Sequence, residues 1–109
     1  MRILSIGDVI GRPGRRALKA LVPGLRQQYH LDLVIANAEN AAGGIGLTLD
    51  TAKELLACGV DILTSGNHIW DKKEIIPHLD GELPILRPLN YPPGSPGRSY
   101  LLHQGALVV

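Results

Sequence analysis

The feature that most constrains the fold is an alternation of short β-prone runs with helical runs. Residues 2–6, 33–36 and 60–64 are short apolar runs bounded by turn residues, which is typical of buried strands. Residues 15–30 and 51–58 have apolar side chains at helical spacing. Because strand–helix–strand units form parallel crossovers with the helices packed on the sheet, the sequence predicts an α/β fold, doubly wound or layered, with a mostly parallel sheet.

Local signals sharpen the two predicted helices. Pro23-Gly24 lies inside the first, where a proline removes a backbone donor, so we expect that helix to be kinked or split. The second helix has two candidate N-caps, Thr48 and Asp50, and Gly59 is placed to end it. These signals predict one interrupted helix and one regular helix.

The last third of the chain gives weaker signals. We expect a short helix over residues 73–79, an extended segment at 85–87 within a Pro-rich stretch, and a hairpin pairing 99–102 with 106–109. The chain ends inside an apolar run that resembles a core strand. We therefore expect residues 1–109 to be the N-terminal portion of a single domain that is C-terminally incomplete, and an unfinished apolar edge that would favour a homo-oligomer.

Composition excludes several classes of protein. The net charge is +1, which gives no support for an RNA partner or a membrane surface. Cys58 is the only cysteine, so neither an intrachain disulfide nor a cysteine-based zinc site is expected, and a reducing cytoplasmic location is favoured. No export signal or membrane-spanning run is apparent.

Polar residues follow each of the three predicted strands, in the segments 7–15, 37–44 and 65–71. Each has an ordinary explanation when taken singly: Asp8 could cap a turn, Asn40 could bond its own backbone, and His68 could be a satisfied polar residue. Taken together they converge at one edge of a parallel sheet, where clustered carboxylates need a compensating cation. The candidate metal-site residues are therefore those with carboxylate, amide or imidazole groups: Asp8, Glu39, Asn40, Asn67 and His68.

These segments read GDVIGRPGR, NAENAAGG and GNHIWD, and together they resemble the YmdB-like branch of the calcineurin-type metallophosphoesterases. The resemblance runs in order over residues 1 to about 75. It departs from the usual calcineurin-type pattern in lacking the histidine of Asp-x-His after Asp8, and in having Glu39-Asn40 where an aspartate motif is usual. Both departures are marks of this branch. The resemblance implies a layered metallophosphoesterase-like fold.

The resemblance also implies an activity and a division of roles. Asp8 would be a terminal ligand of one metal, Glu39 would bridge two metals, and Asn40 and Asn67 would coordinate through amide oxygens. His68 would be the general acid while a metal-bound hydroxide attacks a phosphodiester such as a 2′,3′-cyclic nucleotide. Two divalent ions are implied, with Fe or Mn favoured and Mg or Zn as alternatives. The family's remaining histidine ligands would lie beyond Val109.

Several nearby residues have secondary predictions. Arg12 is a candidate contact for the substrate phosphate, although arginines that open a helix are usually solvated. Trp70 is expected to support the His68 loop by packing, and Asp71 by capping the next helix. His78 and His103 are expected to be exposed.

Two rival functions stay open at this point. The chain could be a non-catalytic nucleotide- or phosphate-binding α/β module, in which residues 7–15 hold a phosphate at a helix N-terminus. It could also be a structural or regulatory fragment. Metal content and diester hydrolysis separate these classes.

Overall fold

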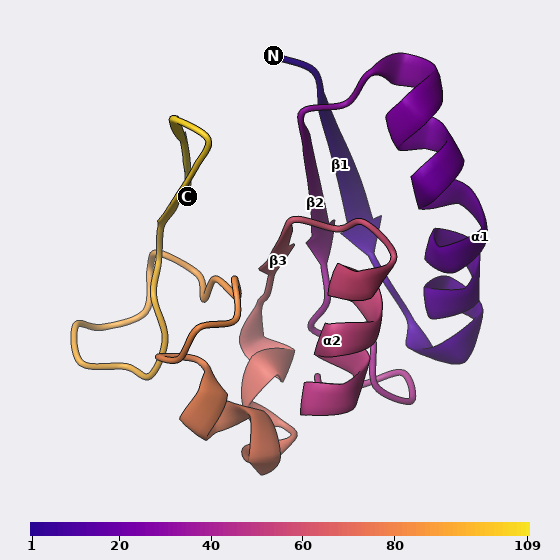
Figure 1. The fold of residues 1–109 in the computed structure, drawn as a ribbon. Helices are drawn as coiled ribbons and strands as arrows, with labels where there is room; N and C mark the ends of the chain where they lie inside the picture. The colour runs from indigo at the N-terminus through magenta and orange to yellow at the C-terminus, as the bar shows by residue number, and fades with distance from the viewer.

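The computed structural model describes residues 1–109 and contains the predicted alternation of strands and helices (Figure 1). The first part of the chain forms β1 (Ile3–Asp8), α1 (Gly11–Tyr29), β2 (Leu33–Asn37), α2 (Leu49–Ala57) and β3 (Ile62–Thr64). Two short 3₁₀ helices follow, η1 (Asn67–Trp70) and η2 (Lys73–His78), and then a hairpin of β4 (Leu101–His103) and β5 (Ala106–Val108). No helix is long and apolar enough to cross a membrane.

The central sheet is parallel, as predicted. Its strand order is β1-β2-β3, with Ile3 opposite Leu33 and Ile35 opposite Ile62. The predicted extended segment continues the sheet beyond β3 through a parallel bridge between Leu63 and Ile85. All the strand ends that carry the candidate site residues therefore lie at one edge of the sheet.

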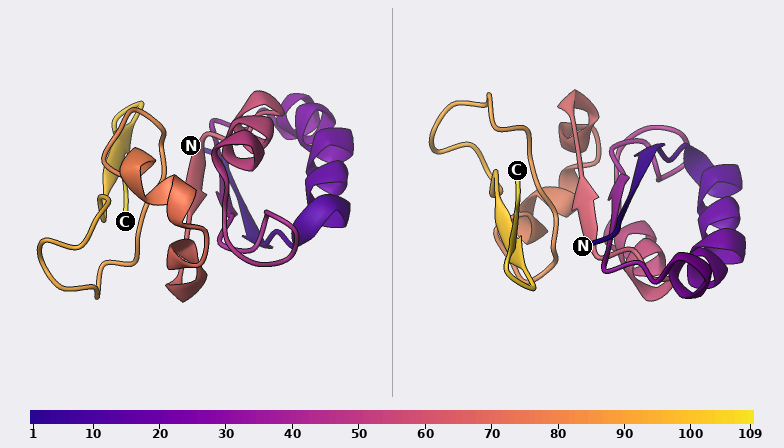
Figure 2. Two further views of the ribbon diagram at one scale, coloured as in Figure 1. Left: turned by 90° about the horizontal axis from the view of Figure 1, so that it is seen from below. Right: turned by 90° about the horizontal axis from the view of Figure 1, so that it is seen from above.

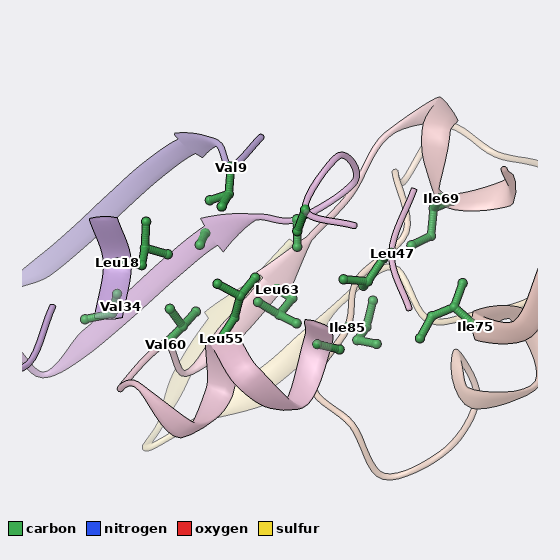
Figure 3. Packing of buried hydrophobic residues seen from close by; sticks show 14 of the residues in the cluster. Val9, Leu18, Val34, Leu47, Leu55, Val60, Leu63, Ile69, Ile75 and Ile85 are labelled. Atoms are coloured by element: carbon green, nitrogen blue, oxygen red, sulfur yellow. The ribbon is translucent and has the colours of Figure 1, made fainter. Parts of the chain in front are cut away.

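The two faces of the sheet are covered by different elements, which makes the fold layered (Figure 2). On one face, Val34 of β2 and Leu63 of β3 join the main hydrophobic cluster with buried residues of α1 and α2, including Leu18 and Leu55 (Figure 3). On the other face, a smaller cluster of Leu33, Ile62 and Leu86 packs under the β4–β5 hairpin. The side chains of β2 alternate between these clusters because successive residues of a strand point to opposite faces.

Helix α1 differs from its prediction at two points. It begins at Gly11 rather than Arg15, and of the two outcomes predicted at Pro23, a kink or a split, the split is wrong because one helix runs through that residue. Pro23 has no N–H, so the carbonyl of Lys19, four residues earlier, lacks its helical hydrogen bond. Both residues are exposed, so water can satisfy that carbonyl. The helix ends at Tyr29, and its C-cap, His30, adopts a left-handed conformation with φ 51°.

The N-terminus of α1 depends on a glycine. Gly11 has φ +58°, a backbone conformation that residues with a side chain rarely adopt. An added Cβ there would lie 3.4 Å from the backbone nitrogen of Gly44. Its own N–H donates to the carbonyl of Asn40 at 3.0 Å. The start of α1 is therefore joined directly to the loop after β2.

Helix α2 follows its prediction. Thr48, rather than Asp50, is the N-cap and forms a reciprocal capping box with Thr51. Gly59 follows the helix with φ +114°.

The C-terminal third also contains the predicted elements, with one correction. The short helix at 73–78 is a 3₁₀ helix, and the hairpin pairs Leu101 with Val108. His78 and His103 were expected to be exposed, but both are partly buried. His103 lies on β4, where its side chain is 27% exposed and its Nε2 is 3.9 Å from Oδ1 of Asp61, because the hairpin packs this strand against the sheet.

Candidate active site

The carboxyl ends of β1, β2 and β3 are joined by backbone hydrogen bonds that hold their loops together. Asp8 is the last residue of β1 and lies opposite Asn37, the last residue of β2, after a register shift between Ile6 and Asp8. The N–H of Val9 donates to the carbonyl of Asn37 at 3.0 Å, and that of Ala38 donates to the carbonyl of Thr64 at 2.9 Å. The loops that carry the candidate ligands thus start from fixed positions.

Asp8 and Asn40 are brought into direct contact. The side-chain nitrogen Nδ2 of Asn40 donates to both carboxylate oxygens of Asp8, at 3.1 Å each. Because this contact uses the amide nitrogen, the amide oxygen of Asn40 stays available to a cation.

Glu39 is held by neighbours on both sides. Asn37 donates to its Oε1 at 3.2 Å and accepts from its backbone N–H at 3.2 Å, while the N–H of His68 donates to Oε2 at 3.0 Å. Gly66 makes room for this carboxylate, since an added Cβ would lie 2.3 Å from Oε1 and 2.5 Å from Oε2. The Glu39 carboxylate therefore bridges the loops after β2 and β3.

His68 lies on η1 and contacts an acidic side chain. Its ring nitrogen Nδ1 is 2.7 Å from Oδ2 of Asp71. The prediction that Asp71 caps the next helix is wrong, because η2 has Lys72 as its N-cap and no side-chain cap bond. Trp70 has the packing role expected of it: it packs against the main core and meets the ring of Tyr91 edge-on, with centroids 5.4 Å apart.

The other candidate residues are less closely integrated. Asn67 and Arg12 are exposed, and their side chains form no hydrogen bond within the chain. Arg15, in contrast, is engaged by the scaffold: it donates to Glu54 at 3.0 Å and to the carbonyl of Ala41 at 2.6 Å. Arg12 is thus free to contact a ligand, whereas Arg15 joins α1 to α2 and to the loop after β2.

The electrostatics of the site favour a cation. Neither Asp8 nor Glu39 forms a salt bridge; the ion pairs of the structure involve Glu54, Asp61 and Asp71 instead. No group of three or more His, Cys, Asp and Glu side chains gathers to hold a metal. The donors present are two carboxylates with neighbouring amides, a set that fits hard or borderline divalent ions but supplies only part of the ligands that two ions require.

The one pocket of the structure lies elsewhere. It is apolar and lies at the start of β1, at the opposite end of that strand from Asp8, and it is lined by Arg2, Ile3, Leu4, Leu25, Tyr29 and Leu31. The candidate site is therefore an open sheet edge rather than an enclosed cavity.

With this geometry established, comparison with known proteins becomes informative. Residues 4–107 match the family model described as YmdB-like protein. The chain belongs to the YmdB-like family. Among curated relatives, the 2′,3′-cyclic-nucleotide 2′-phosphodiesterase of Bacillus subtilis (strain 168) is 49% identical over 98 residues, which cover 90% of this chain and 37% of the relative. A putative phosphatase/phosphodiesterase of Mycoplasma genitalium is 37% identical over 83% of this chain and 32% of its own length.

Solved structures agree with this family assignment. A hypothetical protein from Thermus thermophilus is 48% identical, with a TM-score of 0.87 over 98% of this chain and 42% of that one. A phosphatase from Mycoplasma pneumoniae is 34% identical, with a TM-score of 0.84 over 94% of this chain and 38% of that one. This YmdB-like chain thus has the layered, mostly parallel α/β fold of a metallophosphoesterase, and it spans between about a third and two fifths of the length of these relatives.

Three residues of the sequence motifs shape the site in ways that the sequence did not predict. Asn37 and Gly66 were given no role, and Asp71 was given a wrong one. Asn37 holds Glu39, Gly66 provides space for it, and Asp71 contacts His68. For Asn37 and Gly66 the only signal was membership of the motifs. For Asp71 the signal was its spacing of three residues from His68, which places the two on the same side of a 3₁₀ turn.

Proposed function

We propose that residues 1–109 form the N-terminal portion of a single metallophosphoesterase domain, and that the complete protein is a phosphodiesterase acting on phosphodiesters such as 2′,3′-cyclic nucleotides. The observation that carries this proposal is the pair of carboxylates, Asp8 and Glu39, held at one sheet edge by amide and backbone donors and without any cationic side chain. The name of the Bacillus subtilis relative supports the substrate class.

The residues present would hold their part of a two-metal site. Asp8 would bind one ion, Glu39 would bridge both, and Asn40 and Asn67 would add amide oxygens. Oxygen donors favour Mn or Fe, with Mg or Zn as alternatives. Once bound, such ions supply Lewis-acid activation of water and of the phosphate.

His68 is the proposed general acid. Its backbone N–H is bonded to Glu39 and its ring nitrogen Nδ1 contacts Asp71, so the turn that carries the imidazole is tied to one of the two carboxylates. It would give a proton to the oxygen that leaves phosphorus. Arg12, exposed and without a side-chain hydrogen bond or ion pair within the chain, would contact the substrate phosphate.

The rival phosphate-binding module receives less support from the start of α1. The N–H of Gly11 already donates to Asn40, and Pro13 has no N–H, so only Arg12 among the first three helical residues keeps a free backbone donor. A phosphate cradle normally presents several such donors together.

Glu39→Ala in the complete gene product tests the proposal. Metal content by mass spectrometry should fall from about two ions per chain, and hydrolysis of 2′,3′-cyclic AMP should fall by about a hundredfold or more, since removing a bridging carboxylate exceeds the usual cost of removing its outer partners. Glu82→Ala, which alters an exposed glutamate without a partner, is the matched control. Unchanged hydrolysis in Glu39→Ala would overturn the assignment.

A further inference from the structure

The contact between His68 and Asp71 is built by the shape of η1. In a 3₁₀ helix, residues three apart lie above one another, and His68 and Asp71 have this spacing at the two ends of the turn. The backbone N–H of Asp71 donates to the carbonyl of His68 at 3.1 Å, and the ring nitrogen Nδ1 lies 2.7 Å from Oδ2. The turn therefore brings the carboxylate to one ring nitrogen.

This contact bears on which ring nitrogen of the imidazole donates a hydrogen bond. An ionised carboxylate only accepts hydrogen bonds, so beside an ionised Asp71 it would be Nδ1 that donates. Nε2 is then the ring nitrogen left for other partners. Because the backbone N–H of His68 is also bonded to Glu39 at 3.0 Å, both the main chain and the ring of His68 are held.

The Asp71 carboxylate has no competing role in the fold. It makes no bond to the first turn of η2, and its side chain is 40% exposed, close to the 39% of His68. A half-exposed pair of this kind contributes little to stability. Its more specific effect is on the orientation of the ring.

We propose that Asp71 is a positioning residue for the reaction: it holds His68 so that Nε2, rather than Nδ1, serves the leaving oxygen. This inference rests on the proposed function. In that reaction a water oxygen forms a new bond to phosphorus, and the bond from phosphorus to the ribose oxygen breaks with its electron pair on that oxygen. The proton on Nε2 passes to the ribose oxygen, the water releases a proton to solvent, and His68 regains its proton from solvent.

A leaving-group comparison separates positioning from a structural role. A ribose oxygen needs a proton as it departs, whereas p-nitrophenolate is stable as an anion and needs none. In the complete gene product, Asp71→Ala should lower kcat for 2′,3′-cyclic AMP by about tenfold to a hundredfold with little change in KM. It should change kcat for bis(p-nitrophenyl) phosphate much less.

A second variant and a double substitution complete the test. Asp71→Glu restores a carboxylate and should recover part of the cyclic-nucleotide activity. Asp71→Ala should cost nothing further once His68→Ala is present, because a positioning residue acts only through the ring that it holds. Asp50→Ala, an exposed aspartate without a side-chain partner, is the control and should behave as wild type.

The outcomes are distinct. Equal losses on both substrates, or a further loss in the double variant, would overturn the positioning role. Wild-type protein that hydrolyses neither diester would overturn the proposed function and this inference with it. Circular dichroism and metal content at the wild-type level in Asp71→Ala are expected, and a fall in either would mean that Asp71 acts on the fold or the metals instead.

Discussion

Residues 1–79 and residues 80–109 differ in how they are held in place. The first region contributes fifteen of the sixteen residues of the main hydrophobic cluster, and only Ile85 comes from the second. The second region has just two buried residues, Ile85 and Leu86, and its regular structure is limited to two strands of three residues each. Several of its large apolar side chains are exposed, among them Leu102 at 72% and Tyr100 at 61%.

The difference shows what positions the candidate site. The sheet edge that carries Asp8 and Glu39 is supported by helices packed on a continuous core. The second region attaches to the face of the sheet opposite α1 and α2 through a small cluster, and to the β3 edge through backbone bonds such as the one from the N–H of Leu86 to the carbonyl of Leu63, at 2.8 Å. The site therefore depends mainly on the first region.

The largest expected effect comes from a pair of leucine substitutions that probe both regions. Leu63 is fully buried in the main cluster, so Leu63→Ala should lower the free energy of unfolding by about 2–5 kcal/mol. Leu102→Ala removes the same atoms from an exposed position on the hairpin and should change the free energy of unfolding by less than about 0.5 kcal/mol. Urea unfolding of the complete gene product measures both. Equal losses would abolish the distinction between the regions.

A smaller effect is expected on activity, and it tests whether the first region must leave space at Gly66 for the Glu39 carboxylate. In Gly66→Ala the new methyl group would collide with the Glu39 carboxylate, so hydrolysis and metal affinity should fall by about tenfold to a hundredfold while the fold is kept. Gly7→Ala is the control, because an added Cβ there meets nothing within 4 Å. Kinetics with 2′,3′-cyclic AMP and metal titration give the readout. Similar losses in both variants would argue against a specific role for Gly66.

The smallest effect concerns the link between α1 and α2. The hydrogen bond from Lys19, followed by the positive charge of Arg15, lowers the pKa of Glu54 below its ordinary value of 4.5, although partial burial opposes this shift. A carboxyl group with a lowered pKa adds stability above its unfolded pKa and loses it as the pH falls through its folded pKa.

Glu54→Gln should therefore cost less than about 1 kcal/mol at neutral pH, and the difference from wild type should vanish well below pH 4.5. Thermal melting across this pH range measures it. Glu82→Gln, at an exposed position, should show no such pH dependence. A Glu54→Gln difference that is constant with pH would show that the ion pair is not its source.

Much of the first region could be predicted from sequence because each strand and helix there carries its own periodic pattern. The start of α1 could not, since Gly11-Arg12-Pro13 has the composition of a loop, and its helical start requires the positive φ of Gly11 and the bond to Asn40. The continuity of α1 through Pro23 depended on solvent exposure, which composition does not reveal. The layered arrangement was predicted by the family resemblance, whereas the periodic patterns alone left a doubly wound sheet open.

The site was predictable as a set of strand-end residues, but its internal contacts were not. Parallel topology alone brings Asp8 and Asn40 to one edge, whereas the contacts of Glu39 with Gly66 and with the His68 N–H depend on how two loops meet in space. Asp71 was assigned to the wrong partner because a capping rule was applied without knowing that the turn is 3₁₀. The roles of the ligands and of His68 stay predictions.

The bond between the Glu39 carboxylate and the His68 N–H also has a thermodynamic consequence. Under the proposed roles, one side chain takes part both in cation binding and in the order of the turn that carries the acid, so the two equilibria are linked. Linkage is reciprocal. If a bound cation raises the equilibrium constant for ordering the turn by some factor, the ordered turn raises the affinity for the cation by the same factor. A ligand that contacts only η1 would then change the affinity of a site that it never touches.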